Sequence, residues 1–513
     1  MRMQGSEKPR LLGVGALALF ALSLAPRVAF ADEPVKGKEL RSLSEPGEVT
    51  NVIDAFDDDD PFDLSFTLGY QYTSKSARIT RETYINDVSN PGFSTGGFIA
   101  DTMNVARYSE TTSRLNTRVD IGIYKDIAVF LRMPIVLSND RQLDDLDGSI
   151  RQQDVILQGV PGERLFTLPF KSPQRSGIEY LAVGIDVGIM NQWRDPSKPT
   201  WIIGFESRFS VSDPMHACND NAPAGQVRCA HPADIDRNGQ SGGFEVQGVG
   251  SLEGHGFSGE RKPGISRGTT TLVGHTMLSK RIKYVEPYGG FRTLVELPNS
   301  SSDYTFGDTS ASIVKLPPIE GQVILGMEVI PYENREEFQR VTFDFRVQGA
   351  YRSEGRDYSE LFDALGSSSA PSLRYPIWAG YHAQDGQSVV NPASQKVYFT
   401  GLTNVQAHGK VGLSASITWQ AAEYIKFQLG AGYTHVQGHL ITAEQPCNPQ
   451  FANDPGAAGP CKTTAEVGNN QRRTTVTGVP NPNFRQPIDT TGRRFKVDDI
   501  NLWDGWLNAV VMF

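Results

Sequence analysis

Residues Ser113–Leu137 read SRLNTRVDIGIYKDIAVFLRMPIVL, and this stretch decides the fold. Apolar and polar side chains alternate up to Tyr124, and the alternation resumes at Ile127 after a short turn. A period of two is typical of a β-strand whose two faces meet different surroundings. Two such runs joined by a tight turn predict an antiparallel hairpin. Each run has about ten alternating residues, the length that a tilted strand needs to cross a bilayer. We therefore expect one hairpin of a membrane β-barrel.

Similar alternation recurs along the rest of the chain. The expected runs lie within 62–72, 178–211, 268–297, 321–351, 405–442 and 502–513, with a loop rich in Gly, Asn and Ser from Tyr72 to about Met103. We predict an all-β fold, an antiparallel transmembrane barrel of about twelve strands, with ten or fourteen as the margin. An even number of strands places both termini on the periplasmic side, with short turns there and long loops outside. Aromatic residues beside the short turns, namely Tyr124, Tyr284, Tyr332 and Tyr424, predict a girdle at the inner interface.

The composition agrees with a barrel. The chain has 513 residues, 10% aromatic and 21% charged side chains, and a mean hydropathy of −0.34. A helical membrane protein of this size would carry several apolar runs of about twenty residues, and this chain has one shorter run, at its start. The net charge of −9 argues against nucleic-acid binding. It suits an anionic outer leaflet of lipopolysaccharide only where divalent cations bridge the two.

Residues 1–31 have the features of a secretory signal peptide. A basic start precedes the apolar run Leu11–Ala25, and Ala29-Phe30-Ala31 offers a cleavage site. The alternative is an uncleaved anchor helix. Residues 32–61 predict a periplasmic acidic lead-in, and its run Asp54–Asp63 is expected to be a solvated linker, with a calcium-holding cap or a partial plug of the lumen as alternatives. Residues 62–513 are then the barrel.

A soluble β-sandwich also shows alternating strands, but its outer face is polar. Here one face of the runs is apolar with almost no charge, while the other face carries many charges. A barrel places the apolar face against lipid and the charges in its lumen, and closure removes the unpaired edges that lipid would not tolerate. We therefore predict a barrel.

The last residues resemble a known pattern. Counting back from the terminal Phe513, alternate positions are Val511, Ala509 and Leu507. This ending resembles the C-terminal strand of bacterial outer-membrane β-barrels, which their barrel-assembly machinery reads. The resemblance covers 62–513 and implies the outer membrane of a Gram-negative bacterium, a porin-like or transporter-like barrel, and that machinery as a partner. It names no substrate family.

Six charges of the polar face come in three pairs of opposite sign two residues apart, so both members of a pair share a face, and two more, Arg132 and Asp186, stand singly. They are the candidate lumen-lining residues: Arg118, Asp120, Arg132, Asp186, Glu206, Arg208, Asp344 and Arg346. Such a lumen either passes small polar solutes, with opposed charges setting selectivity, or is plugged by a salt-bridged network. The sequence favours neither.

The four cysteines form two close pairs, Cys218 with Cys229 and Cys447 with Cys461, and predict two disulfides within loops of an exported chain. Between the pairs, Asp234, Asp236, Asn238 and Glu245 match the calcium-loop pattern of EF-hands. Ser241 departs from that pattern and no helices flank it, so a lone calcium-binding loop is the stronger hypothesis than an EF-hand domain. Loops rich in Asp, Asn and Gly are also common without metal.

Enzymatic barrels need a His beside a Ser or an acidic partner at the rim. His435 and His439 lie at the outer end of a strand without a serine motif, and His275 has apolar parity, which predicts an interfacial position. We therefore expect no enzyme and no cofactor apart from calcium. The predicted function is a channel or transporter for small polar or amphipathic solutes. The alternatives are a non-conducting anchor of an outer-membrane secretion, motility or polysaccharide machine and an outer-membrane hydrolase. The oligomeric state is not predicted.

Overall fold

The structure is a computed structural model of the chain. It describes residues 49–50, 52, 55, 63–86, 98–146, 164–221, 227–229, 259–305, 314–334, 336–368, 370, 373, 377–378, 400–442, 462–463, 479–480, 484–485 and 494–513. The chain divides into Met1–Glu39, outside the described residues, and Leu40–Phe513, which contains every described element. No helix among the described residues has the length and apolar character that a membrane crossing requires.

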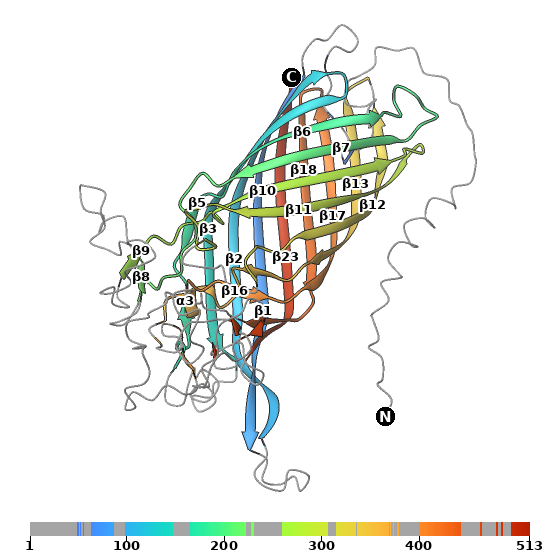
Figure 1. The fold of residues 1–513 in the computed structure, drawn as a ribbon. Coiled ribbons are helices and arrows are strands. Elements are labelled where there is room, and N and C mark those ends of the chain that lie inside the picture. Colours follow the sequence, from blue (N-terminus) through green and yellow to red (C-terminus); the bar gives the residue numbers. More distant parts are fainter. Residues whose placement is uncertain are drawn as a thin grey trace, which may run out of the picture. The chain divides into compact units, whose positions relative to one another are not determined.

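Twelve antiparallel strands form a closed barrel (Figure 1), as the sequence predicts. Each strand pairs with the next one in the wall, and the last strand pairs with the first. In order around the barrel they are β1 (Leu64–Asn86), β2 (Phe98–Tyr124), β3 (Ile127–Asp145), β6 (Leu181–Met190), β7 (Thr200–Phe209), β10 (Thr269–Ser279), β11 (Val285–Pro298), β12 (Glu320–Asn334), β13 (Gln339–Arg352), β17 (His408–Ala422), β18 (Ile425–Val436) and β23 (Phe495–Met512).

The barrel closes between β1 and β23. Leu64 and Phe513 exchange two backbone hydrogen bonds, of 3.1 and 2.8 Å, and the pairing continues from there along β1 as far as Arg81. On its other side β1 pairs with β2 along its whole length. The wall therefore has no free edge, the condition for a sheet in lipid.

The outward face of the wall is an apolar band. The large side chains that alternate toward this face are exposed, for example Leu413 and Leu429 at 55% and 58%. The residues next to these two leucines, namely Gly412, Ser414, Gln428 and Gly430, point inward and are polar or glycine. A continuous exposed apolar surface of this kind is stable only against lipid. The four tyrosines expected in a girdle (Tyr124, Tyr284, Tyr332 and Tyr424) are all exposed beside short turns, as predicted.

Two strands are longer than predicted. The residues from Tyr72 to Met103, expected to be a loop, are largely strand, because β1 continues to Asn86 and β2 begins at Phe98. The extension of β1 carries Thr, Ser, Lys and Arg at both alternating positions, for example Lys75 next to Ser76. Apolar and polar residues alternate where one face of a strand meets lipid. A strand that continues beyond the bilayer has no lipid-facing side, so its sequence loses this alternation.

The two ends of the barrel differ in their connections. At one end, called the turn end, the connections are short, such as Lys125–Asp126 and Glu423–Tyr424, and β1 begins and β23 ends there. At the other, called the loop end, long connections carry the remaining elements. These are β4 (Phe170–Lys171), β5 (Arg175–Ile178), β8 (Val227–Cys229), β9 (Gly259–Arg261), β14 (Gly355–Asp357), α3 (Phe362–Gly366), β15 (Ile377–Trp378), β16 (Thr403–Val405), β19 (His439–Thr442), β20 (Lys462–Thr463), β21 (Val479–Pro480) and β22 (Phe484–Arg485).

The assignment of faces can be tested with a charge on adjacent residues of β18. Leu429→Arg puts a guanidinium on the lipid face near the middle of the strand, and we expect it to lower the free energy of unfolding in lipid vesicles by about 2–4 kcal/mol. Its neighbour Gln428 points inward and contacts Asn508. Gln428→Arg is the matched control and should have a much smaller effect. Equal losses in denaturant titrations followed by tryptophan fluorescence would contradict the assignment.

Candidate functional site

The candidate site is the polar interior of the wall from β2 to β7. Three arginines, Arg118, Arg132 and Arg208, occupy one row across neighbouring strands, with Ala182 of β6 between the last two. We call them the arginine row. The adjacent row toward the turn end is Asp120, Phe130, Gly184 and Glu206. The two rows are two residues apart along each strand, about 6.6 Å at the usual rise per residue, so the basic row lies within side-chain reach of the acidic row.

Ion pairs link the two rows. Arg118 binds Asp120, with 2.5 Å between Nη2 and Oδ1, and also reaches Asp186 at 3.3 Å. Glu206 accepts hydrogen bonds from Arg132 and Arg208 through one oxygen, Oε1. The ring of Tyr180, just before β6, lies 5.7 Å from the guanidinium carbon of Arg132 and 4.9 Å from that of Arg208. The Glu206 carboxylate and the Tyr180 ring therefore stabilise the guanidinium groups of Arg132 and Arg208 side by side, despite their like charges.

Glycine makes room for these contacts at two positions. Gly204 lies between Asp186 and His275 in the same row, and a Cβ there would stand 2.2 Å from atoms of both side chains. Across it, Asp186 Oδ1 and His275 Nε2 are 3.1 Å apart. Gly184 likewise lies under the Phe130 ring, on which Arg118 stacks at 4.1 Å.

The wall from β11 to β13, with β12 between them, carries a separate group. Tyr288 donates a hydrogen bond to Asp344 (2.6 Å), and Arg346 contacts both the Tyr288 hydroxyl (2.9 Å) and Asp344 (3.1 Å). Although Arg118 and Arg346 point inward, their side chains are 35% and 33% exposed. The interior at their level therefore holds accessible space.

The loop end is filled by an apolar cluster. Its loop residues pack against inward side chains of β1, β2, β3, β18 and β23, and they are Leu165, Phe166, Phe170, Leu361, Ala364, Leu365, Ala370 and Leu373. We call these loop residues the loop plug. Among the wall residues that they cover, Ile79, Phe495 and Val497 are completely buried. At this level the interior is occupied by protein.

Arg175 of β5 holds the loop plug. It forms a bidentate ion pair with Asp363 of α3, at 2.6 and 2.9 Å, and its side chain has no exposed surface. Two further N–H groups donate to the carbonyl oxygens of Pro263 and His216, at 3.2 and 3.1 Å. One guanidinium thus joins the connections before β6, before β10 and before β17. A buried arginine needs several acceptors of this kind to offset its lost hydration.

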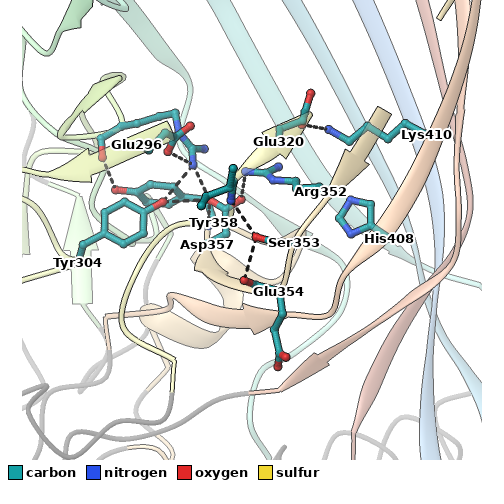
Figure 2. Close-up of polar contacts among 12 residues, drawn as sticks. Glu296, Tyr304, Glu320, Arg352, Ser353, Glu354, Asp357, Tyr358, His408 and Lys410 are labelled. Atoms are coloured by element: carbon teal, nitrogen blue, oxygen red, sulfur yellow. Dashed lines mark hydrogen bonds and ion pairs between the residues drawn. The ribbon is translucent and has the colours of Figure 1, made fainter. Parts of the chain in front are cut away.

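A second polar cluster stands beside the plug (Figure 2). Asp357 of β14 accepts hydrogen bonds from Arg352, from Arg267 at 2.6 Å and from the Tyr304 hydroxyl at 2.9 Å. Burial favours the neutral form of this carboxyl, but Arg267 and Arg352 outweigh burial and hold its pKa well below its ordinary value. Figure 2 shows Glu320 and Lys410 alongside, joined by an ion pair of 2.7 Å.

At the turn end, residues before β1 enter the barrel. Val49 and Val52 pack against the inward side chains of Ile202, Met277 and Tyr288. Thr50 is buried, and its hydroxyl is 2.7 Å from that of Ser279. Part of the predicted lead-in therefore lies inside the lumen, while its acidic residues Asp57–Asp60 lie outside the described residues.

The candidate lumen residues named from the sequence thus fall into two groups, six charges on β2, β3, β6 and β7 and the Asp344–Arg346 pair on β13. The Cys218–Cys229 disulfide is present, with 4.9 Å between the Cα atoms. Cys447, Cys461 and the four residues proposed for calcium (Asp234, Asp236, Asn238 and Glu245) lie outside the described residues.

The histidines differ in outcome. His435 is exposed and 3.3 Å from Asn501, in keeping with an interfacial position. The prediction for His275 is wrong, since it points inward and contacts Asp186. The run of β10 carries apolar residues on both faces, including the buried Val273 and Met277, so parity alone misassigned the lumen face. His439 stacks on His408, with ring centroids 4.1 Å apart.

Sequence reasoning missed Tyr180, Arg175 and Arg292. Arg292 follows Phe291 in β11 and has the parity of the lumen face, so alternation alone would have placed it inward. Tyr180 and Arg175 precede β6 in a segment without periodicity, and no local pattern identifies them.

A closed wall with an apolar exterior and charged interior defines a β-barrel of the bacterial outer-membrane type. No protein-family model and no curated protein matches the sequence. Among solved structures, the COG4313 outer membrane channel from Pseudomonas putida F1 is 9% identical with a TM-score of 0.33, covering 91% of this chain and 99% of that one. A Pseudomonas aeruginosa FadL homologue is 7% identical (TM-score 0.29, 88% and 90% covered), and the outer membrane protease OmpT from Escherichia coli is 8% identical (TM-score 0.24, 90% and 100% covered). At these TM-scores the likenesses carry no inference about what this chain does.

The role of Arg175 can be tested by removing its partner. Asp363→Ala leaves a buried guanidinium without its carboxylate, and we expect the loop plug to lose about 3–5 kcal/mol of stability. Hydrogen exchange of the α3 amides measures this loss. Lys198→Ala breaks the exposed Lys198–Asp195 pair and should cost less than about 1 kcal/mol. Unchanged protection of α3 in the Asp363 variant would exclude the clamp.

Acid should loosen the same region. Burial opposes the charge of Asp303, but Arg261 and His216 hold the pKa of this loop carboxyl below its ordinary value of 3.8. A carboxyl with a lowered pKa stabilises the folded state above its ordinary pKa, and this contribution disappears as the pH falls through the folded-state value. We therefore expect proteolysis of the loop end to accelerate below about pH 4. Asp303→Asn should flatten this dependence, and the exposed Asp213→Asn should not.

Proposed function

We propose that the chain is a channel of the Gram-negative outer membrane that passes small polar or amphipathic solutes. The observation that carries the proposal is the exposure of inward-facing charges at mid-barrel. Arg118 and Arg346 keep about a third of their side-chain surface accessible inside a closed wall, whereas Arg175 in the loop plug keeps none. A lumen filled throughout for structural reasons would bury all of them alike.

The loop plug gives such a channel a closed state. It packs on the inward faces of β1, β2, β3, β18 and β23, and one buried ion pair joins it to the connection before β6. At the turn end, Val49, Thr50 and Val52 narrow the lumen. Passage therefore requires movement of both segments, so we propose transport that is gated. No covalent chemistry is needed.

A non-conducting anchor is the second candidate. The complete burial of Arg175 and of the wall residues beneath the plug favours it, because a permanent seal needs no accessible path. Calcium at the loop of Asp234, Asp236, Asn238 and Glu245 remains a proposal, which conductance recorded with and without calcium would test.

The channel is tested by ion selectivity in planar bilayers. Neutralising Arg118 and Arg208 together with Gln removes two positive charges from the lumen. We expect the ratio of cation to anion permeability to rise roughly fivefold, since a unit charge at 4 Å in water contributes about 1 kcal/mol. Reversal potentials in a KCl gradient report this ratio.

The matched control is Arg78→Gln, which removes an arginine that pairs with the exposed Asp499 and is itself 45% exposed. It should leave the permeability ratio unchanged. Ohmic openings whose selectivity ignores the double substitution would place the conducting path elsewhere. The absence of any opening, also after Asp363→Ala releases the plug, would favour the anchor.

A further inference from the structure

We propose that Arg132, Arg208 and Arg292, with Tyr180, form a binding site inside the lumen for small organic monocarboxylates. This inference rests on the proposed channel function and names its substrate class. The three guanidinium groups come from β3, β7 and β11, so the site spans several strands of one side of the wall.

Arg292 is the distinguishing residue. It points inward, paired in register with His275 on one side and Gln322 on the other. It interacts electrostatically with Arg132, Arg208, Glu206 and Tyr180, and two of these four are like charges. Among the described residues no carboxylate forms an ion pair with it, whereas Arg132 and Arg208 share Glu206. An arginine held beside two others without its own anion is destabilising unless a ligand provides one.

The sum of the charges around Arg292 indicates the charge of the ligand that the site would bind. The arginine row and Arg292 contribute four guanidinium groups, and Asp120, Asp186 and Glu206 contribute three carboxylates. The neighbouring Arg114–Glu179 pair adds one of each sign. Within this group one positive charge therefore remains, which a monoanion would balance.

The shape of the groups favours a carboxylate. Planar guanidinium groups bind carboxylates through two parallel hydrogen bonds. Glu206 shows that a carboxylate fits between Arg132 and Arg208, which both donate to its Oε1. The ring of Tyr180 lies beside both arginines and offers an apolar surface for the remainder of the ligand.

Benzoate is the probe, with benzamide as its neutral isostere. Calorimetric titration of the refolded barrel in detergent should show binding of benzoate and not of benzamide. Arg292→Gln should weaken benzoate binding about tenfold or more, the loss expected for a charge-assisted hydrogen-bonded pair. Arg292→Lys, which keeps the charge but loses the fork, should lie between. Arg78→Gln, on a separate ion pair, should leave the affinity unchanged.

Thermal unfolding separates a binding role from a packing role. If Arg292 is held for a ligand, Arg292→Gln removes repulsion and should raise the unfolding midpoint of the ligand-free barrel while it weakens benzoate binding. A lower midpoint with unchanged benzoate affinity would assign Arg292 to packing and overturn the proposal.

Two further results would also overturn it. Inorganic phosphate binding as tightly as benzoate would reject the monocarboxylate class. A barrel that conducts KCl but does not bind benzoate would reject this site and leave the channel standing, whereas a barrel that neither conducts nor binds would reject both.

Discussion

In a bilayer every backbone N–H and C=O group of the protein needs a partner within the protein, and this constraint shapes the rest of the structure. Here it is met by twelve antiparallel pairings that end where they begin, with β23 against β1. Once the wall is closed, alternate side chains must point either to lipid or inward. Leu131, Phe205 and Phe345 point outward. Their neighbours along the strands therefore point inward, which places the arginine row, the acidic row beside it and the Asp344–Arg346 pair inside the barrel.

The interior uses charge in two different ways. Arg175 is fully buried, and its N–H groups reach a bidentate carboxylate and two carbonyl oxygens, so it acts as a structural joint between loops. The arginines at mid-barrel share carboxylates, stack on Phe130 and Tyr180, and retain accessible surface. A charge that is completely satisfied holds a fixed structure, whereas one that is partly satisfied remains available to a solute. The difference between these environments separates the plug from the proposed path.

The class of fold could be predicted from the sequence because lipid and water impose opposite demands on neighbouring residues, as in Ser113–Leu137. Where neighbouring residues do not face lipid and water in turn, the sequence-based predictions were wrong. The extension of β1 beyond Tyr72 carries polar residues at both parities, and β10 carries apolar residues on both faces, so His275 was assigned to the wrong one. Arg175 meets Asp363 across 188 residues, a contact without local pattern. The charges on β2, β3, β6 and β7 could be named as candidates, but which of them share a partner depends on strand register.

The pairing of β1 with β23 also determines when the barrel can close during its assembly. The first strand of the wall begins at Leu64 and its partner is β23, so the ring cannot close until β23 has arrived. Until then β1 exposes one row of unpaired backbone groups, and the growing sheet is prone to pair with other chains. Contacts of such long sequence separation form slowly. A chain of this design therefore needs protection of its open edge throughout export, and removal of β23 leaves an unclosed sheet rather than a smaller barrel.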